Sequence, residues 1–513
     1  MSNDLSKLLW DTTLLYPYPT SGELADDLAA ATGRAKSFRD RYLGKVANLD
    51  AAGLCTALRD YETLQEEVIK PQLYTHLLFA ADSEDETNKA LSQKAAEIGN
   101  LVSREILFFD LEIMAIEEEP FGKLIVAGEL AQYRHYLESV RKYREHTLPE
   151  REEQLLKQKS LTGADAFTRL FDEISSSFRY RMVMEGEEQE FTGEELLGLL
   201  HHHDARTREL AFSTFLDRHA EEKIVFGAVF NNITLDHGQE LELRGYSSPM
   251  EPTNIGNELS ATVVGQLMNV TEENYPLARE YFRLKAGLLG LAKLKNSDIY
   301  APLGSSSRRY TFDEARKLVT EAYEAFHPAY ATIIDAFFNE RRIDALPRPG
   351  KGGGAFCMGM TPALPPYVLL NFTGNLRDVA TIAHELGHGL HFVLAQRQSM
   401  LNYHAPLPLA ETASVFGEML LTRLLLAREP DPAVKAELLC ATIEDIIATT
   451  FRQNVLTRFE ERLHLERREG LLSAARIGDI WLEENAKLYG DAVEMIPSYS
   501  WGWSYISHFI HAR

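Results

Sequence analysis

Cysteine is scarce in this sequence, and its scarcity excludes two classes of protein. Only three cysteines, Cys55, Cys357 and Cys440, occur among 513 residues. Their odd number and wide spacing argue against a disulfide framework and against a cysteine-based metal site. A chain of this length can bury a large core without such cross-links, and it is long enough for two or more domains or lobes.

Positive charge and long apolar runs are also in short supply. The chain carries 53 Lys and Arg against 76 Asp and Glu, a net charge of -23. This balance argues against nucleic acid and anionic membrane surfaces as partners. No stretch approaches the roughly 18 apolar residues of a spanning helix, and residues 1–11 lack the pattern of a signal peptide. We expect a soluble cytoplasmic protein that does not bind membranes.

Glycine and proline are sparse over the first 175 residues, where apolar and charged residues alternate at helical spacing. We expect helices at 24–42, 51–69, 87–109 and 121–144. The sequence therefore predicts an N-terminal helical lobe over residues 1–185 and a catalytic domain over 186–513.

Two short stretches are typical of strands instead. Residues 178–191 read as a hairpin that turns at Gly186. Residues 349–360 are dense in glycine and lead to a β-prone run at 367–372. A strand there could hold a peptide backbone along its free edge, although a connecting loop is the simpler interpretation of the glycines alone.

The stretch from Thr381 to His391 carries the chemistry. His384 and His388 are four residues apart, so a helix places them on one face, one turn apart. Two such imidazoles can share a metal ion, and Glu385 beside them can accept a proton from water. This is the H-E-x-x-H pattern of zinc peptidases, with the histidines as ligands and the glutamate as general base.

Such a site needs a third protein ligand from another element and an open position for water. Downstream, residues 409–426 form a strongly helical run that begins near Glu411 and carries Glu418 two turns later. We expect Glu411 to be the third ligand and Glu418 to orient a ligating histidine. His404 is the alternative third ligand. Asp378 is either a second orienting carboxylate or a residue that favours the helix N-terminus.

Other histidines are weaker candidates. His391 lies on the same predicted face as His384, but one straight helix cannot wrap three ligands around an ion. His201, His202 and His203 are adjacent, so helical geometry would point them about 100° apart. We interpret these three as a helix-end cluster.

With these stretches identified, the chain resembles the oligoendopeptidase F family, which is related to thimet oligopeptidase. The resemblance runs nearly from end to end and is carried by an ordered series of motifs. They are Trp10-Asp11, Arg244-Gly245-Tyr246, Pro349-Gly-Lys, Gly354-Ala-Phe-Cys357, Asn371-Phe372, Asp378 to His384, and Ala410 to Glu418.

The resemblance implies a mainly α, two-lobed zincin-type metallopeptidase with a deep substrate channel and a small β element beside the zinc helix. It implies a zinc-dependent endopeptidase for short unstructured peptides, with one zinc ion per chain. By motif position His384, His388 and Glu411 would be the ligands and Glu385 the base, and His508 would help to stabilise the tetrahedral intermediate.

One departure concerns the C-terminal end. In the family a tyrosine-rich segment follows the histidine that His508 matches, whereas this sequence stops at Arg513. We therefore expect a C-terminally incomplete chain or a member without that segment.

Two other functions are open at this stage. One is a catalytically impaired peptide-binding protein of the same fold, and the other is a zinc aminopeptidase. The oligomeric state, the peptide sequence preference and the choice of zinc over cobalt or manganese are also open.

Overall fold

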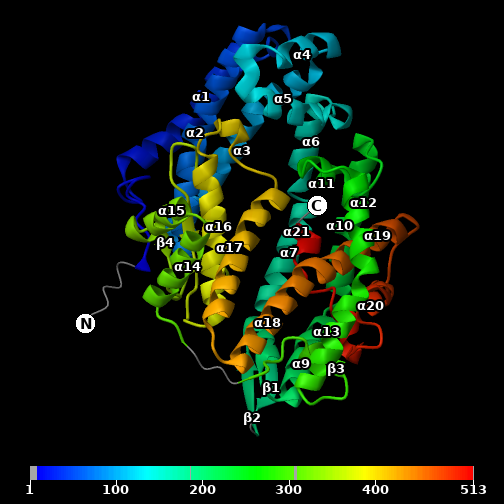
Figure 1. The fold of residues 1–513 in the computed structure, drawn as a ribbon. Helices are drawn as coiled ribbons and strands as arrows, with labels where there is room; N and C mark the ends of the chain where they lie inside the picture. The colour runs from blue at the N-terminus through cyan, green and yellow to red at the C-terminus, as the bar shows by residue number, and fades with distance from the viewer. Residues whose placement is uncertain (1–7, 185, 305–308, 512–513) are drawn as a thin grey trace. The chain divides into compact units, whose positions relative to one another are not determined.

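The computed structural model describes residues 8–184, 186–304 and 309–511, and it is mainly helical, as predicted. The chain forms two compact units, each built from two separate segments (Figure 1). The first unit comprises residues 1–150 and 307–428, and the second comprises 151–306 and 429–513. The predicted boundary at 185/186 falls inside the second unit. The predicted division into an N-terminal lobe and a catalytic domain stays a prediction.

The first unit contains nine helices and three short strands in the described residues. They are α1 (Gly22–Tyr42), α2 (Ala51–Ala81), α3 (Glu86–Ala115), α4 (Glu118–Ile125), α5 (Arg134–Arg141), α14 (Phe312–Phe326), α15 (Pro328–Asn339), β4 (Ile343–Asp344), β5 (Phe356–Met358), β6 (Tyr367–Leu369), α16 (Leu376–Ala395) and α17 (Leu407–Arg428). Short 3₁₀ turns connect several of them.

The second unit begins within α6, and it also contains few strands. Its elements are α6 (Glu150–Ser160), α7 (Ala164–Ser177), β1 (Tyr180–Met184), β2 (Glu187–Phe191), α8 (Gly193–Gly198), α9 (Ala205–Glu221), α10 (Lys223–Arg244), α11 (Glu251–Gly256), α12 (Ala261–Glu273), α13 (Tyr275–Leu288), β3 (Leu294–Lys295), α18 (Pro432–Ile446), the π-helical segment η8 (Ile447–Arg452), α19 (Gln453–Arg468), α20 (Ala474–Tyr489), β7 (Val493–Glu494) and α21 (His508–His511).

The helices predicted near the N-terminus are largely confirmed. α1, α2 and α3 cover the first three predicted ranges, and α2 continues to Ala81 through Pro71. The fourth prediction, a single helix over 121–144, is wrong. The chain there forms α4, a 3₁₀ turn at Gly128–Tyr133 and then α5. Gly128 lies in the break, where its low helix propensity favours an interruption.

Backbone hydrogen bonds join the two segments of the first unit. Ser83 N–H donates to the carbonyl of Gly350 at 2.6 Å, and Gly352 N–H donates to the carbonyl of Ala80 at 2.8 Å. These contacts fasten the glycine-rich loop to the end of α2. An N-terminal segment and a segment more than 200 residues later therefore share one folded body.

Both predicted β elements are present. β1 and β2 form an antiparallel hairpin in the second unit. In the first unit β6 lies between β4, to which it is parallel, and β5, to which it is antiparallel, so β5 is an edge strand of this sheet as described. α16 contacts both β5 and β6. The small β element therefore lies beside the helix that carries the H-E-x-x-H pattern.

Candidate metal centre

α16 begins where its sequence favours a helix start. The side chain of Asn375 accepts a hydrogen bond from the N–H of Asp378, and Asp378 in turn accepts from the N–H of Asn375, which forms a capping box. Asp378 also accepts from the N–H groups of Thr373 and Gly374. Of its two predicted roles, the structure therefore shows Asp378 at the helix N-terminus.

An apolar stripe along α16 packs into the core of the first unit. Val379, Ala383 and Leu386 are fully buried, and Leu390 is nearly so. They contact side chains of α14, α15 and the sheet. Burial of this stripe fixes the rotation of α16 about its axis, so the side chains of His384 and His388 project from a different face.

α17 lies alongside α16 over much of its length (Figure 1). Two glycines allow this close approach. A methyl group at Gly387 would lie 2.4 Å from the carbonyl oxygen of Ala413, and one at Gly417 would lie 2.4 Å from the carbonyl oxygen of Ala383. Because real Cβ atoms do not approach so closely, glycine at both positions sets how near the two helices come.

Three side chains from these two helices converge. Nε2 of His384 lies 3.6 Å from Oε2 of Glu411, and Nε2 of His388 lies 3.7 Å from the same oxygen. The ligand atoms of all three residues lie within 4.8 Å of one another. Within the described residues this is the one such group of histidine, cysteine and acidic side chains.

These distances suit a zinc ion. Four ligands at about 2.0–2.2 Å in a tetrahedral arrangement stand roughly 3.3–3.6 Å apart. Two imidazole nitrogens and one carboxylate oxygen are also a ligand set that zinc favours. The side chain of Glu411 is 52% exposed, so the group is open on one side. The residues present therefore fit the metal that the sequence predicts.

Neighbouring polar groups hold two of these side chains in place. Nδ1 of His384 lies 2.5 Å from Oε1 of Glu418, so Nε2 is the nitrogen directed at Glu411. The hydroxyl of Ser414 donates to Oε2 of Glu411 at 2.8 Å. Glu418 matches its predicted place, because residues 411 and 418 share a face of α17.

Glu385 is buried beside the histidines, on the side of the sheet. Its carboxylate accepts a hydrogen bond from the backbone N–H of Cys357 on β5. Burial is the main cause that raises the pKa of Glu385 to about 7. The charge of His384 lowers this pKa, and the charge of Glu411 raises it. A carboxyl group with a pKa near neutrality can both accept and return a proton at physiological pH.

The remaining candidate residues are not members of this group. His508 is the first residue of α21 in the second unit, and its side chain is exposed. Its predicted role in catalysis stays a prediction. His391 and His404 are not members of the converging group. His404 instead contacts the rings of Phe392 and Tyr403.

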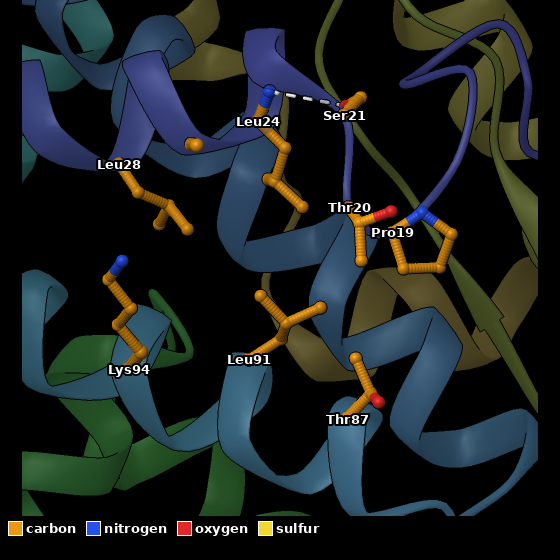
Figure 2. A pocket seen from close by; sticks show the side chains of 9 residues that line it. Pro19, Thr20, Ser21, Leu24, Leu28, Thr87, Leu91 and Lys94 are labelled. Carbon is orange, nitrogen blue, oxygen red and sulfur yellow. Dashed lines mark hydrogen bonds between the residues drawn. The ribbon is translucent and has the colours of Figure 1, made fainter.

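A hollow in the first unit is a poor alternative site. Figure 2 shows it between the start of α1 and α3, with Leu24, Leu28 and Leu91 turned towards it. Its volume is about 150 Å³, below the usual size of a ligand pocket. None of the converging metal-ligand candidates lines it.

Three features of this site were not predicted from the sequence: the contact of Ser414, the backbone of Cys357, and the paired glycines of α16 and α17. Ser414 lies three residues after Glu411, a spacing that could have suggested a contact on one helical turn. The other contacts join distant segments, and no local pattern signals them.

Comparison with known proteins agrees with this architecture. A family model described as peptidase family M3 matches residues 198–513, and one described as oligopeptidase F matches residues 112–180. Oligopeptidase PepF of Bacillus subtilis is 25% identical over 92% of this chain and 71% of its own length. Group B oligopeptidase PepB of Streptococcus agalactiae is 25% identical over 98% of this chain and 84% of its own length.

Solved structures show the same fold. A crystal structure of a protein from Chlamydophila abortus superposes with a TM-score of 0.81 at 24% identity, over 98% of this chain and 85% of that one. Oligoendopeptidase-F from Enterococcus faecium gives a TM-score of 0.67 at 25% identity, over 95% and 82%. Because the M3 model covers more than half of the sequence and the relatives align with most of it, the chain belongs to peptidase family M3, among the oligoendopeptidase F proteins.

Proposed function

We propose that this protein is a zinc-dependent endopeptidase that hydrolyses internal bonds of short, unstructured peptides. The observation that carries the proposal is the convergence of His384, His388 and Glu411 beside the buried Glu385. Membership of peptidase family M3 supports the reaction class. The names of the relatives, oligopeptidase and oligoendopeptidase, support short substrates and internal cleavage.

In this proposal His384, His388 and Glu411 hold one zinc ion per chain. When bound, zinc would act as a Lewis acid that polarises a peptide carbonyl and lowers the pKa of water. Glu418 holds the Nδ1 proton of His384, which keeps the Nε2 lone pair available to the metal. Ser414 fixes the position of one Glu411 oxygen.

Glu385 is the general base. It takes the proton of the attacking water and later passes it to the leaving amine. Its burial and its hydrogen bond from the N–H of Cys357 hold the carboxylate on one side of the histidines. His508 is assigned a supporting role, donating to the oxyanion of the tetrahedral intermediate. That assignment rests on motif position alone.

β5 is proposed to align the substrate. It is the edge strand of its sheet, and its Cys357 contacts the general base through the backbone. A peptide that paired with the free edge of β5 in extended form would bring its backbone close to Glu385. This arrangement needs no particular substrate side chain, which suits a peptidase for varied short peptides.

Location and partners follow from the sequence and remain part of the proposal. No described helix is both long and apolar enough to span a membrane. We assign the enzyme to the cytoplasm, with peptides as its partners and without nucleic acid.

The first experiment combines metal analysis with peptide cleavage. The purified chain is analysed for zinc and incubated with a nonapeptide blocked at both ends, and products are identified by mass spectrometry. Internal cleavage that is abolished by chelation and restored by zinc is the expected result. Glu385→Gln removes the base and is expected to retain zinc without cleaving, whereas Glu324→Gln, at an exposed position on α14, serves as the matched control.

Three results would contradict the proposal. Stoichiometric zinc without cleavage would favour a peptide-binding protein of the same fold. Cleavage confined to the first residue of an unblocked peptide would indicate an aminopeptidase. The absence of bound zinc, together with cleavage that survives Glu385→Gln, would refute the ligand assignment itself.

A further inference from the structure

Two histidines meet on neighbouring helices of the second unit. His237 belongs to α10 and His464 to α19, and the two helices are in contact. The centroids of the two rings lie 5.0 Å apart, with the ring planes at 63°. Both residues are half-buried, so part of each remains open to solvent. The two rings are therefore close enough to share one ligand.

The arrangement of this pair resembles that of the two histidines in the candidate metal centre. The ring centroids of His384 and His388 lie 4.9 Å apart, with the ring planes at 83°. Two imidazole nitrogens that bind one zinc ion tetrahedrally, each at about 2.0–2.1 Å, place their ring centroids roughly 5 Å apart. Both pairs of histidines match this separation.

A backbone hydrogen bond fixes the position of the proton on one of the rings. Nε2 of His237 lies 3.0 Å from the carbonyl oxygen of Pro249. Because a carbonyl only accepts, Nε2 carries the proton and Nδ1 carries the lone pair. Histidines that bind metals commonly donate their other N–H to a backbone carbonyl in this way. Pro249 comes within reach because α10 ends at Gly245, whose φ of +70° turns the chain out of the helix.

The ring of His464 is also suited to binding a metal. Within the described residues, neither of its nitrogens has a hydrogen-bond partner. Burial is the main cause that lowers the pKa of His464 to about 4. The ring is therefore neutral at pH 7, and one of its nitrogens has a free lone pair.

A carboxyl group lies one helical turn away from this ring. Glu460 precedes His464 by four residues on α19, which is the spacing of His384 and His388 on α16. Burial raises the pKa of Glu460 to about 8, and no positive charge of a described residue counters this rise. A buried carboxylate is costly without a cation, and a bound metal ion would supply one.

We propose that His237 and His464, with Glu460 as the third ligand, bind a divalent transition-metal ion of the zinc type. Imidazole nitrogens and a carboxylate oxygen are ligands that zinc favours. The ligand atoms of the three residues do not all lie within 4.8 Å of one another, so the Glu460 side chain has to rotate to reach the ion. The ion would fasten α10 to α19. Since the site uses no residue of the candidate metal centre, this inference is independent of the proposed function.

The principal alternative is that the two rings only pack against each other. Arg468 follows His464 by one helical turn, and its charge also lowers the pKa of His464. The same charge opposes a metal cation. The two roles differ in what they need, because packing depends on the shape of the ring whereas metal binding depends on its nitrogens. A phenylalanine at position 464 therefore separates them.

The test measures metal binding in a chain that lacks the other candidate site. The full chain with His384→Ala and His388→Ala is titrated with Zn²⁺ in competition with a chromophoric chelator. Cu²⁺ is the second probe, and electron paramagnetic resonance reports its ligands. We expect one equivalent of Zn²⁺ and coupling of Cu²⁺ to nitrogen. Added Zn²⁺ is also expected to raise the unfolding temperature, because an ion that binds only the folded state stabilises it.

Variants assign the binding to the three proposed ligands. His464→Phe keeps an aromatic ring, and we expect it to weaken Zn²⁺ binding more than the roughly 10- to 100-fold cost of losing a residue that only supports a ligand. His237→Gln retains a donor for Pro249 and should have the same effect. Glu460→Gln should weaken binding at least about 10-fold. His203→Gln, at an exposed position, is the matched control and should leave binding unchanged.

The inference is overturned if the parent chain binds neither Zn²⁺ nor Cu²⁺ at millimolar concentration, or if binding survives both His464→Phe and His237→Gln. Unchanged affinity in Glu460→Gln would overturn the assignment of the third ligand. Thermal unfolding without metal monitors the fold of each variant. If the parent chain does not fold, wild type replaces it. His464→Phe must then remove one equivalent of bound Zn²⁺ from wild type, and the inference fails if it removes none. Peptide cleavage is not measured, so failure of the proposed function would be a separate result.

Discussion

Glu418 and His384 are hydrogen-bonded, with Oε1 of Glu418 2.5 Å from Nδ1 of His384. The two residues are 34 positions apart and belong to different helices. The bond determines which ring nitrogen of His384 is directed at Glu411. A carboxylate that holds a ligating histidine in this way also raises its basicity, so in the proposed zinc site both the direction and the strength of the metal bond would depend on Glu418.

Glu418→Gln is therefore expected to weaken zinc binding about 10- to 100-fold. The amide is similar in size but cannot accept the Nδ1 proton as strongly, and it removes one negative charge beside the site. Zinc affinity can be measured by competition with a chromophoric chelator. Glu324→Gln provides the control at an exposed position. Unchanged affinity would show that Glu418 does not orient the ligand.

Gly387→Ala tests the crossing of α16 and α17. The added methyl group would meet the carbonyl oxygen of Ala413 at 2.4 Å and Cα of Ser414 at 2.7 Å. Overpacking of this kind costs about 1–3 kcal/mol of unfolding free energy. We expect weaker zinc binding as well, because displacement of α17 moves Glu411.

Gly33→Ala is the matched control for that substitution. Gly33 lies within α1 of the same unit, and a Cβ there would meet no atom within 4 Å. Alanine is the better helix former, so a gain of up to about 1 kcal/mol is expected. Urea unfolding measures both variants. Equal stability of the two variants would contradict the steric argument.

Lys351→Met tests the ionic network that joins Lys351 and Arg348 to Asp344 of β4. The Lys351 side chain is fully buried, and its Nζ donates to Oδ1 of Asp344 at 2.7 Å and to the carbonyls of Leu346 and Leu370. Removing one partner of a buried pair typically costs about 3–5 kcal/mol. We expect a loss near the lower end, because Arg348 also bonds to Asp344.

The matched control is Lys89→Met, which removes an exposed partner of Glu86. Exposed pairs contribute about 0–1 kcal/mol. Thermal or urea unfolding of both variants gives the comparison. A loss below about 1 kcal/mol for Lys351→Met would show that the network is not needed to hold the sheet.

The buried histidine His219 predicts a loss of stability in acid. It is 2% exposed among aromatic rings of the second unit, and burial lowers its pKa to about 4. In the unfolded chain a histidine has a pKa of about 6.5. Between these values the unfolded state binds more protons, so stability is full above about pH 6.5 and falls as the pH decreases towards 4.

The expected size of this effect is about 2 kcal/mol between pH 7 and pH 5. His219→Phe should remove that part of the pH dependence, and His203→Gln, at an exposed position, should not. Glu460, whose pKa burial raises to about 8, acts in the opposite sense. The decisive quantity is therefore the difference between wild type and His219→Phe in urea unfolding at the two pH values. The assignment would be contradicted if the difference in unfolding free energy between wild type and His219→Phe were the same at both pH values.

Local patterns in the sequence predicted a substantial part of the candidate site. The spacing of His384 and His388 is a property of residues four apart, which neighbouring turns of a helix bring together. The capping residues of α16 and the β-prone run at 367–372 are equally local. Each was therefore predictable, because short-range geometry depends on few residues.

Only the tertiary structure decided how these pieces meet. Glu411 reaches the histidines because Gly387 and Gly417 let α17 approach α16, and that contact joins segments some 30 residues apart. The same limit applies to the two compact units, each of which combines distant segments. The sequence by itself determined most of the N-terminal helices and the spacing of His384, Glu385 and His388 on one helix. Packing between distant segments determined the site, because helical periodicity carries no information on the distance between helices.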